Sequence, residues 1–111
     1  MSLEPREYLR HILAEADYLT ETSQGLSVEE FLTSDTLRRA FVRSLEVIGE
    51  ATKQLPENFR ASYPQTEWRS MARMRDRLIH AYFGVDYELV WEVVQTKVPE
   101  LRSGLHAILG G

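Results

Sequence analysis

Residues 66–83 read TEWRSMARMRDRLIHAYF, and this stretch decides how the chain folds. At about 100° per residue, a helix through it gathers most of its apolar side chains on one side. Those side chains are Trp68, Met71, Ala72, Leu78, Ile79 and Tyr82. Arg75 falls among them. Burial of an unpaired guanidinium away from water raises the free energy of the folded state by on the order of several kcal/mol. We therefore expect this face to open onto a polar cleft, a seam between subunits or a carboxylate partner.

Helical periodicity continues on both sides of that stretch, and no segment alternates apolar and polar residues for long enough to predict a strand. A first helix is expected from about Pro5 until shortly before Gly25. A short helix follows a capping box in residues 27–30. A second long helix begins at Ser34 or Asp35, both good N-caps, and stops at Pro56. Residues 56–64 form a connector with a single helical turn around residues 58–60.

Two further helices complete the chain. Thr66 is expected to cap the helix that carries Arg75, and Gly84 to end it. Asp86 caps the last long helix, in which Pro99 predicts either a kink or two abutting helices. Together these elements predict an all-α fold, an antiparallel four-helix bundle with extra short helices and a kinked C-terminal helix. Residues 1–111 are expected to form a single domain, because a chain of this length buries roughly two-thirds of its unfolded surface.

Composition limits the classes of function. The chain has no cysteine, which excludes disulfides, thiolate metal sites and cysteine nucleophiles. It carries a net charge of -4, while residues 67–80 contain four arginines and two acids. A small basic patch on an acidic body suits transient phosphate contact. No leader, membrane span, metal motif or cofactor motif is visible, so we expect a soluble, cytoplasmic protein without a cofactor.

Arg75, His80 and Tyr82 form an R-x4-H-x-Y string. Positions five apart in a straight helix differ by about 140° in azimuth, so Arg75 and His80 of one helix face different points, whereas Arg75 and Tyr82 share a face. Either the helix frays toward Gly84 and swings His80 round, or two chains pair and contribute complementary residues. A seam between two chains would cover the surface of Trp68, Met71 and Leu78. Asp76, four residues before His80, is expected to place its carboxylate against the imidazole.

The string suits phosphodiester chemistry. RNA carries its own nucleophile, the 2′-hydroxyl, so a ribonuclease without metal needs a base, an acid and a cation for the developing charge. Histidine, with an ordinary pKa of about 6.5, serves as base or acid, and arginine is a permanently charged donor for phosphate oxygens. The alternative from the same pattern is purely structural: Arg75 pairs with Glu46 or Glu50 of the neighbouring helix, and His80 lies on the surface.

Three segments together resemble the HepT-like branch of the HEPN superfamily, over nearly the whole chain. They are MRDRLIHAYFGVD at residues 74–86, LEVIGEA at 45–51 and VPEL at 98–101. Members of that family are small helical bundles, usually homodimers, whose R-x4-6-H motif forms a metal-independent ribonuclease site in the dimer cleft. The resemblance implies that Arg75 binds the scissile phosphate and that His80 transfers protons.

The resemblance also implies a regulator. Many members are toxins whose antitoxin partner is a minimal nucleotidyltransferase of the MntA type, which silences the R-x4-H-x-Y subgroup by attaching AMP to the motif tyrosine. Carried across, Tyr82 is the AMP acceptor. AMP there would add bulk and negative charge to the face of Arg75. The position after the motif arginine is most often asparagine in the wider superfamily, so the role of Asp76 stays open.

Other residues have weaker patterns. Glu46 and Glu50 resemble the family's E-x-I-G-E-A segment and are expected either to hold Arg75 or Arg77 in place or to form a solvated face. Arg73 and Arg77 either contact the RNA backbone or are simply exposed. Glycine in mid-helix lowers helix stability by about 1 kcal/mol relative to alanine. We expect Gly49 to be present because two helices approach each other closely there. The two isolated histidines, His11 and His106, are interpreted as surface residues.

Our leading hypothesis is a dimeric ribonuclease toxin that uses Arg75 and His80 and is regulated through Tyr82. The rival hypothesis is a helical module without catalysis, which docks onto a nucleotidyltransferase and presents a nucleotide or substrate to it.

Overall fold

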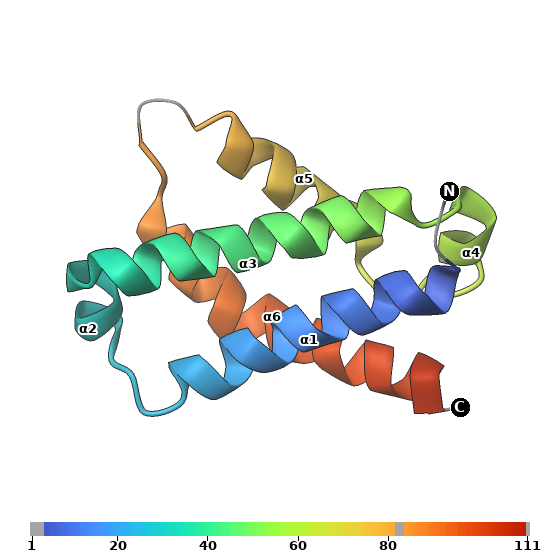
Figure 1. Cartoon of the computed structure of the whole chain (residues 1–111), viewed down its shortest axis with the longest axis horizontal. Helices are drawn as coiled ribbons and strands as arrows, with labels where there is room; N and C mark the ends of the chain where they lie inside the picture. Colours follow the sequence, from blue (N-terminus) through green and yellow to red (C-terminus); the bar gives the residue numbers. More distant parts are fainter. Residues whose placement is uncertain (1–3, 82–83, 111) are drawn as a thin grey trace.

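The structure is a computed structural model that describes residues 4–81 and 84–110. Within those residues the regular elements are all helices (Figure 1). In chain order they are α1 (Pro5–Ser23), α2 (Val28–Thr33), α3 (Asp35–Gln54), α4 (Glu57–Ala61), α5 (Trp68–Ile79) and α6 (Tyr87–Gly110). The predicted all-α class is confirmed.

The four long helices alternate in direction along the chain (Figure 1). α1 packs against both α3 and α6, the short α2 touches α3 and α6, and α5 packs chiefly against α3. The predicted antiparallel arrangement is therefore confirmed, with α2 and α4 as the extra short helices. Because α3 is the main neighbour of α5, the surface around Arg75 is built where these two helices meet.

Side-chain caps fix three of the helix starts as the sequence predicts. Ser27 and Glu30 form a reciprocal capping box at α2: the Glu30 backbone N–H donates to Ser27 Oγ at 3.1 Å, and the Ser27 N–H donates to Glu30 Oε1 at 2.9 Å. Ser34 Oγ accepts from the Leu37 N–H at 3.1 Å at the start of α3. Asp86 Oδ1 accepts from the Leu89 N–H at 3.1 Å at the start of α6. Each bond satisfies a backbone donor that has no partner inside its helix.

One cluster of buried apolar side chains holds these helices together. Its members are Leu9, Ile12, Ala16, Leu19, Phe31, Phe41, Leu45, Ile48, Ala51, Leu55, Trp68, Met71, Met74, Leu78, Val90, Val93, Val94, Val98, Leu101 and Leu105. Trp68, Met71 and Leu78 are thus buried by the chain's own helices, at 5%, 4% and 8% exposure. The expectation that a second chain covers this surface is wrong, because α5 turns these residues toward α3. No helix in the described ranges is long and apolar enough to cross a bilayer.

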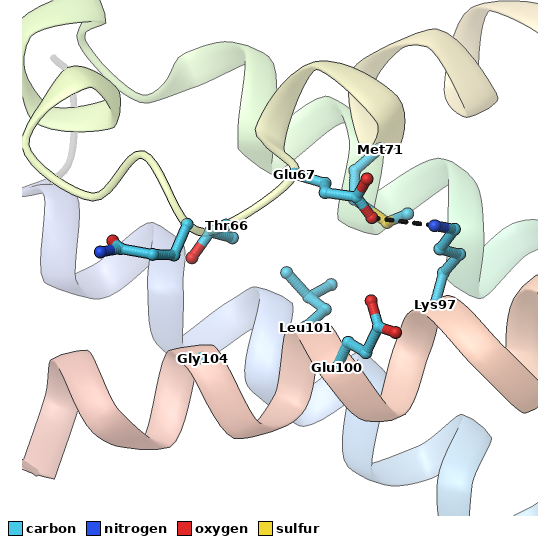
Figure 2. A pocket seen from close by; sticks show the side chains of 8 residues that line it. Thr66, Glu67, Met71, Lys97, Glu100, Leu101 and Gly104 are labelled. Carbon is cyan, nitrogen blue, oxygen red and sulfur yellow. Dashed lines mark hydrogen bonds and ion pairs between the residues drawn. The ribbon is translucent and has the colours of Figure 1, made fainter.

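The start of α5 differs from the prediction. The helix begins at Trp68 with Glu67 as its N-cap, and neither Thr66 nor Glu67 provides a side-chain cap. Thr66 lies instead beside α6, where its Oγ1 would be 3.3 Å from a Cβ placed on Gly104 (Figure 2). Close by, Lys97 Nζ of α6 pairs with Glu67 Oε2 at 3.1 Å (Figure 2). The Thr66 hydroxyl thus lies against α6 and does not cap its own helix.

The end of α5 also differs from the prediction. The helix stops at Ile79 with His80 as its C-cap, several residues before Gly84. The carbonyl oxygen of Asp76 accepts from the His80 backbone N–H at 3.2 Å and also lies 2.7 Å from His80 Nδ1. A histidine side chain near a helix C-terminus competes for the last carbonyl groups in this way. The early end of α5 matches the fraying in the first of our two alternatives, but the imidazole is directed to the Asp76 carbonyl group and not to Arg75, so His80 is not swung round as that alternative required.

Pro99 lies inside α6, which continues from Tyr87 to Gly110. The alternative of two abutting helices is therefore wrong. Proline removes one N–H from the helix and leaves the carbonyl oxygen four residues earlier without its usual partner. That residue, Gln95, is exposed, so water can hydrogen-bond to its carbonyl group.

Gly49 confirms the expected close approach of two helices. A Cβ built on Gly49 would collide with Cβ of Arg75 and would lie 2.8 Å from the carbonyl oxygen of Met71. Both neighbours belong to α5, so the backbones of α3 and α5 touch where α3 has no side chain. This contact determines how close the Arg75 backbone lies to α3.

Gly49→Ala is therefore expected to destabilise the protein by about 1–3 kcal/mol, because the added methyl group forces the two helices apart. Alanine in an unconstrained helix interior would stabilise by about 1 kcal/mol, so the sign of the change is the test. Urea unfolding monitored by circular dichroism measures it. The matched control is Gly104→Ala, whose methyl group meets only the Thr66 hydroxyl and should be close to neutral. A stabilising Gly49→Ala would contradict the packing described here.

Candidate active site

The Arg75 side chain begins against Gly49 and ends near the surface. Its Cβ and Cγ are the atoms that a side chain at position 49 would meet, and the whole side chain is 25% exposed. Arg75 is therefore half-buried, and its face opens toward solvent, as expected for an arginine among apolar side chains. Its aliphatic stem covers the α3–α5 contact while the guanidinium reaches toward solvent, which is the usual compromise for a long charged side chain.

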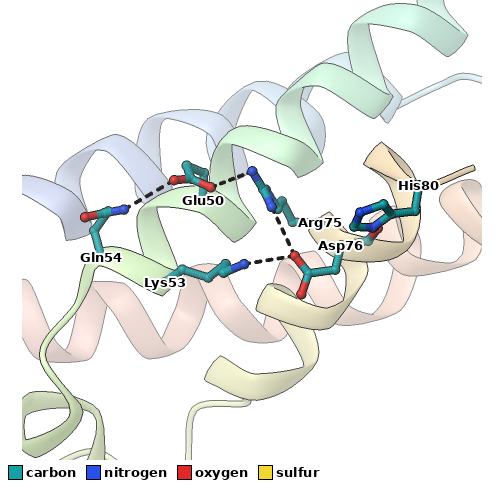
Figure 3. A network of polar contacts seen from close by, with 6 residues as sticks. All are labelled: Glu50, Lys53, Gln54, Arg75, Asp76 and His80. Atoms are coloured by element: carbon teal, nitrogen blue, oxygen red, sulfur yellow. Dashed lines mark hydrogen bonds and ion pairs between the residues drawn. The ribbon is translucent and has the colours of Figure 1, made fainter.

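Two carboxylates hold the guanidinium. Arg75 Nη2 pairs with Glu50 Oε2 of α3 at 3.0 Å, and Nη1 pairs with Asp76 Oδ1 of α5 at 3.1 Å (Figure 3). Glu50 in turn accepts from the Gln54 amide nitrogen at 3.2 Å. Of the alternatives left open by the sequence, pairing of Arg75 with a glutamate of the neighbouring helix is thus the observed state. Both acids are more than 40% exposed, so a ligand phosphate has access to the pair.

Asp76 connects Arg75 with a second cation. Lys53 Nζ of α3 lies 3.0 Å from the same Oδ1 that Arg75 contacts (Figure 3). The hydrogen bond from Lys53 and then that from Arg75 keep the pKa of Asp76 below its ordinary value of 3.8. Asp76 therefore stays ionised down to acidic pH, and it holds Lys53 and Arg75 close to one another despite their like charges.

A backbone carbonyl group orients the His80 side chain. Its Nδ1 lies 2.7 Å from the carbonyl oxygen of Asp76, so the expected contact with the Asp76 carboxylate is wrong. That carboxylate is occupied by Lys53 and Arg75. A carbonyl oxygen can only accept, so the contact requires the hydrogen on Nδ1 and leaves Nε2 as the nitrogen with a free lone pair. The imidazole is exposed at the end of α5, while the guanidinium turns toward α3 (Figure 3).

A groove of about 320 Å³ opens beside Arg75, between α1, α3 and α5. Its lining residues are Tyr8, His11, Arg43, Glu46, Val47, Glu50, Ala51, Gln54, Arg75 and Ile79. Glu46 and Glu50, both predicted as supporting residues, thus lie in one groove with Arg75, although only Glu50 reaches its guanidinium. His80 is not among the lining residues.

The remaining predicted residues lie apart from this network. Arg73 and Arg77 are exposed on α5, consistent with either interpretation of them. Tyr82 lies outside the described residues. The structure therefore brings Arg75, Asp76 and Glu50 together, and it places His80 one helical turn beyond Asp76.

Sequence reasoning missed several residues of this region. Lys53 follows Glu46 and Glu50 at helical spacing, and nothing in that spacing indicates that Lys53 meets Asp76. His11, interpreted as an isolated surface residue, is exposed but shares the groove with Arg75. Arg43 and Tyr8 line the same groove. The spacing of Tyr8 and His11 places them on neighbouring faces of one helix, but only the docking of α1 on α3 brings them to the site.

Lys53→Ala should raise the pKa of Asp76, because it removes the largest cause of the depression. A carboxyl group whose pKa is lower in the folded protein stabilises the fold at pH values above its ordinary, unfolded-state pKa. This contribution is lost as the pH falls through the pKa of the folded state. Titration of the Asp76 carboxyl carbon by NMR between pH 2 and 6 measures the effect. Lys97→Ala removes another exposed lysine, which pairs with Glu67 just before α5, and should leave the pKa of Asp76 unchanged. Equal Asp76 midpoints in native protein and Lys53→Ala would refute this assignment.

Comparison with known proteins shows which family the chain belongs to. The chain matches the family described as "Ribonuclease HepT-like" over residues 12–108. It is 50% identical over 105 residues to a "putative RNase" of Caldanaerobacter subterraneus subsp. tengcongensis, covering 95% of this chain and 94% of that protein. It is 41% identical over 98 residues to a "probable ribonuclease HepT" of Thermococcus cleftensis, covering 88% and 89%. No solved structure gives a significant match. The chain that places Arg75 and His80 at the end of α5 therefore belongs to the HepT-like ribonuclease family.

Proposed function

We propose that this protein is a metal-independent endoribonuclease and the toxin of a HepT/MntA-type toxin–antitoxin module. The observation that carries the proposal is the pair of groups near the end of α5. A guanidinium is held at the surface by two exposed carboxylates, and an imidazole whose Nε2 has a free lone pair follows one turn later. Both residues lie within the segment that matches the ribonuclease family.

In the proposed reaction, a phosphate of the RNA binds the Arg75 guanidinium. A phosphate carries charge that competes with Glu50 and Asp76 for the same planar donor fork. The 2′-oxygen attacks phosphorus while its proton passes to a base, and the bond from phosphorus to the 5′-oxygen breaks as an acid protonates that oxygen. The products are a 2′,3′-cyclic phosphate and a free 5′-hydroxyl. His80 Nε2, the ring nitrogen not used by the Asp76 carbonyl group, is the proposed proton-transfer group.

The proposed active form is a homodimer. Arg75 and His80 of one chain point to different places, and one imidazole cannot be base and acid in the same step. A second copy would add a second histidine, so that one acts as base and the other as acid.

Cleavage of end-labelled RNA by the purified protein in excess EDTA tests the proposal. We expect 2′,3′-cyclic phosphate ends, and we expect His80→Ala to lower the rate about 10²- to 10⁴-fold, the usual contribution of a proton-transfer group. Arg75→Lys should also lose most activity, because a lysine keeps the charge but not the two-pronged donor geometry.

Two matched variants control for folding. Arg69→Ala removes another exposed arginine of α5, and His106→Ala removes an exposed histidine of α6, so both should retain activity. RNA that stays intact with the native protein, in EDTA and in added Mg²⁺ alike, would overturn the ribonuclease assignment and favour a module that only binds nucleotides.

The proposed regulator is a minimal nucleotidyltransferase that attaches AMP to Tyr82, two residues beyond His80. AMP at that position would bring a negative phosphate close to the Arg75–His80 region and would repel RNA. Intact-mass measurement after co-expression with such an enzyme should show AMP-sized additions in the native chain and none in Tyr82→Phe. Tyr87→Phe, a neighbouring tyrosine on α6, is the matched control and should be modified like the native chain. Additions that persist in Tyr82→Phe would show that the acceptor lies elsewhere.

A further inference from the structure

The groove beside Arg75 has two chemically different parts. Apolar groups come from Val47, Ala51 and Ile79, which range from buried to 42% exposed. The polar groups come from all three helices: Tyr8 and His11 of α1, Arg43, Glu46, Glu50 and Gln54 of α3, and Arg75 of α5. The volume of about 320 Å³ is at the small end of the range for ligand sites. A flat molecule with an apolar face and polar edges fits this combination.

Arg75 joins the groove to the region of Asp76 and His80. Its Nη2 meets Glu50, which lines the groove, and its Nη1 meets Asp76, which does not. Asp76 in turn provides the carbonyl oxygen that holds the His80 imidazole. A phosphate bound at the guanidinium would therefore have the groove on one side and the imidazole region on the other. In an RNA strand, the group attached next to such a phosphate is a nucleoside.

The fixed charges of the groove do not favour a second phosphate in it. Glu46 and Glu50 line it together with Arg43 and Arg75, so two carboxylates are matched by two guanidinium groups. Glu50 is engaged by Arg75 and Gln54, so Glu46 is the carboxylate that can accept hydrogen bonds from the amino and ring N–H groups of a nucleobase. Tyr8, half-buried, also lines the groove, and aromatic rings are common stacking partners of bases.

We propose that this groove is a nucleobase subsite, which binds the base of one of the two nucleotides joined by the scissile phosphate. The proposal rests on the proposed ribonuclease function. Because its acceptor is the Glu46 carboxylate, the subsite favours guanine, adenine and cytosine, which present amino groups, over uracil, whose ring N–H lies between two carbonyl oxygens that a carboxylate repels. The chain thereby gains a sequence preference next to the cleaved bond.

Cleavage of short oligonucleotides with a single ribose, all other sugars being 2′-O-methylated, tests the subsite. One series places an abasic site on the 5′ side of the cleaved bond and a second places it on the 3′ side. On one of the two sides, loss of the base should lower kcat/KM about 5- to 150-fold, the range for binding one base on an aromatic surface. Equal kcat/KM for all abasic and intact substrates would overturn the proposal.

Glu46→Gln separates base recognition from a structural role. It should reduce the preference for amino-bearing bases over uracil, and it should leave cleavage of the abasic substrate unchanged. The matched control is Glu92→Gln, an exposed glutamate of α6 outside the groove, which should keep the full base preference. An equal loss on intact and abasic substrates in Glu46→Gln would assign Glu46 to the scaffold of Arg75 and not to a base.

Binding without cleavage keeps this proposal distinguishable from the ribonuclease assignment. Guanosine 3′-monophosphate added to the isotope-labelled His80→Ala protein should shift the NMR signals of Tyr8, Val47 and Ala51, and uridine 3′-monophosphate should bind more weakly. Inorganic phosphate should shift Arg75 without these groove signals. Nucleotide shifts confined to other surfaces, or a groove that is covered by a second copy of the chain, would overturn the subsite even if the protein cleaves RNA.

Discussion

The contact between the backbones of α3 and α5 at Gly49 is the constraint on which the site depends. Because position 49 has no side chain, the stem of Arg75 lies directly on α3 and its head emerges beside Glu50. Every group that meets the guanidinium takes its place from this contact. A larger residue at position 49 would raise α5 and would separate Arg75 from Glu50 and Asp76 from Lys53 in one step. Packing and electrostatics are therefore coupled at this point of the fold.

The arrangement of charges answers the question raised by an arginine within an apolar stripe. Its guanidinium is not stranded in the core, because two partly exposed acids neutralise it. Pairs exposed to this degree contribute little to stability, so they can be exchanged for a phosphate at modest cost. Asp76 also keeps Lys53 within reach, and an incoming phosphate would meet two cations after displacing the acid between them. Without ligand, the two cations and the two carboxylates of this site balance in charge. The site becomes cationic only where a phosphate displaces the carboxylates.

Much of the fold follows from local sequence patterns, because helix periodicity and capping are local effects. Ser27, Ser34 and Asp86 cap the helices that their spacing predicts. One error lies where a contact distant in sequence decides, because Thr66 faces α6 in place of capping α5. The early end of α5 is a local effect that the helical pattern does not reveal: the His80 imidazole contacts the Asp76 carbonyl group four residues earlier. The site shows the same division: the sequence predicts Arg75 and its glutamate partner, while Lys53 and the groove of Tyr8 and His11 emerge only when α1, α3 and α5 are docked.

The most direct test of this account is the crystal structure of His80→Ala bound to an RNA fragment with a 2′-O-methyl group at the cleavage position. We predict one phosphate at the Arg75 guanidinium in place of the Glu50 or Asp76 carboxylate. The 5′-oxygen of that phosphate should lie next to the position that the His80 imidazole occupies in the native protein, either in the same chain or in a second copy. RNA bound elsewhere, with Arg75 still paired to both acids, would contradict it.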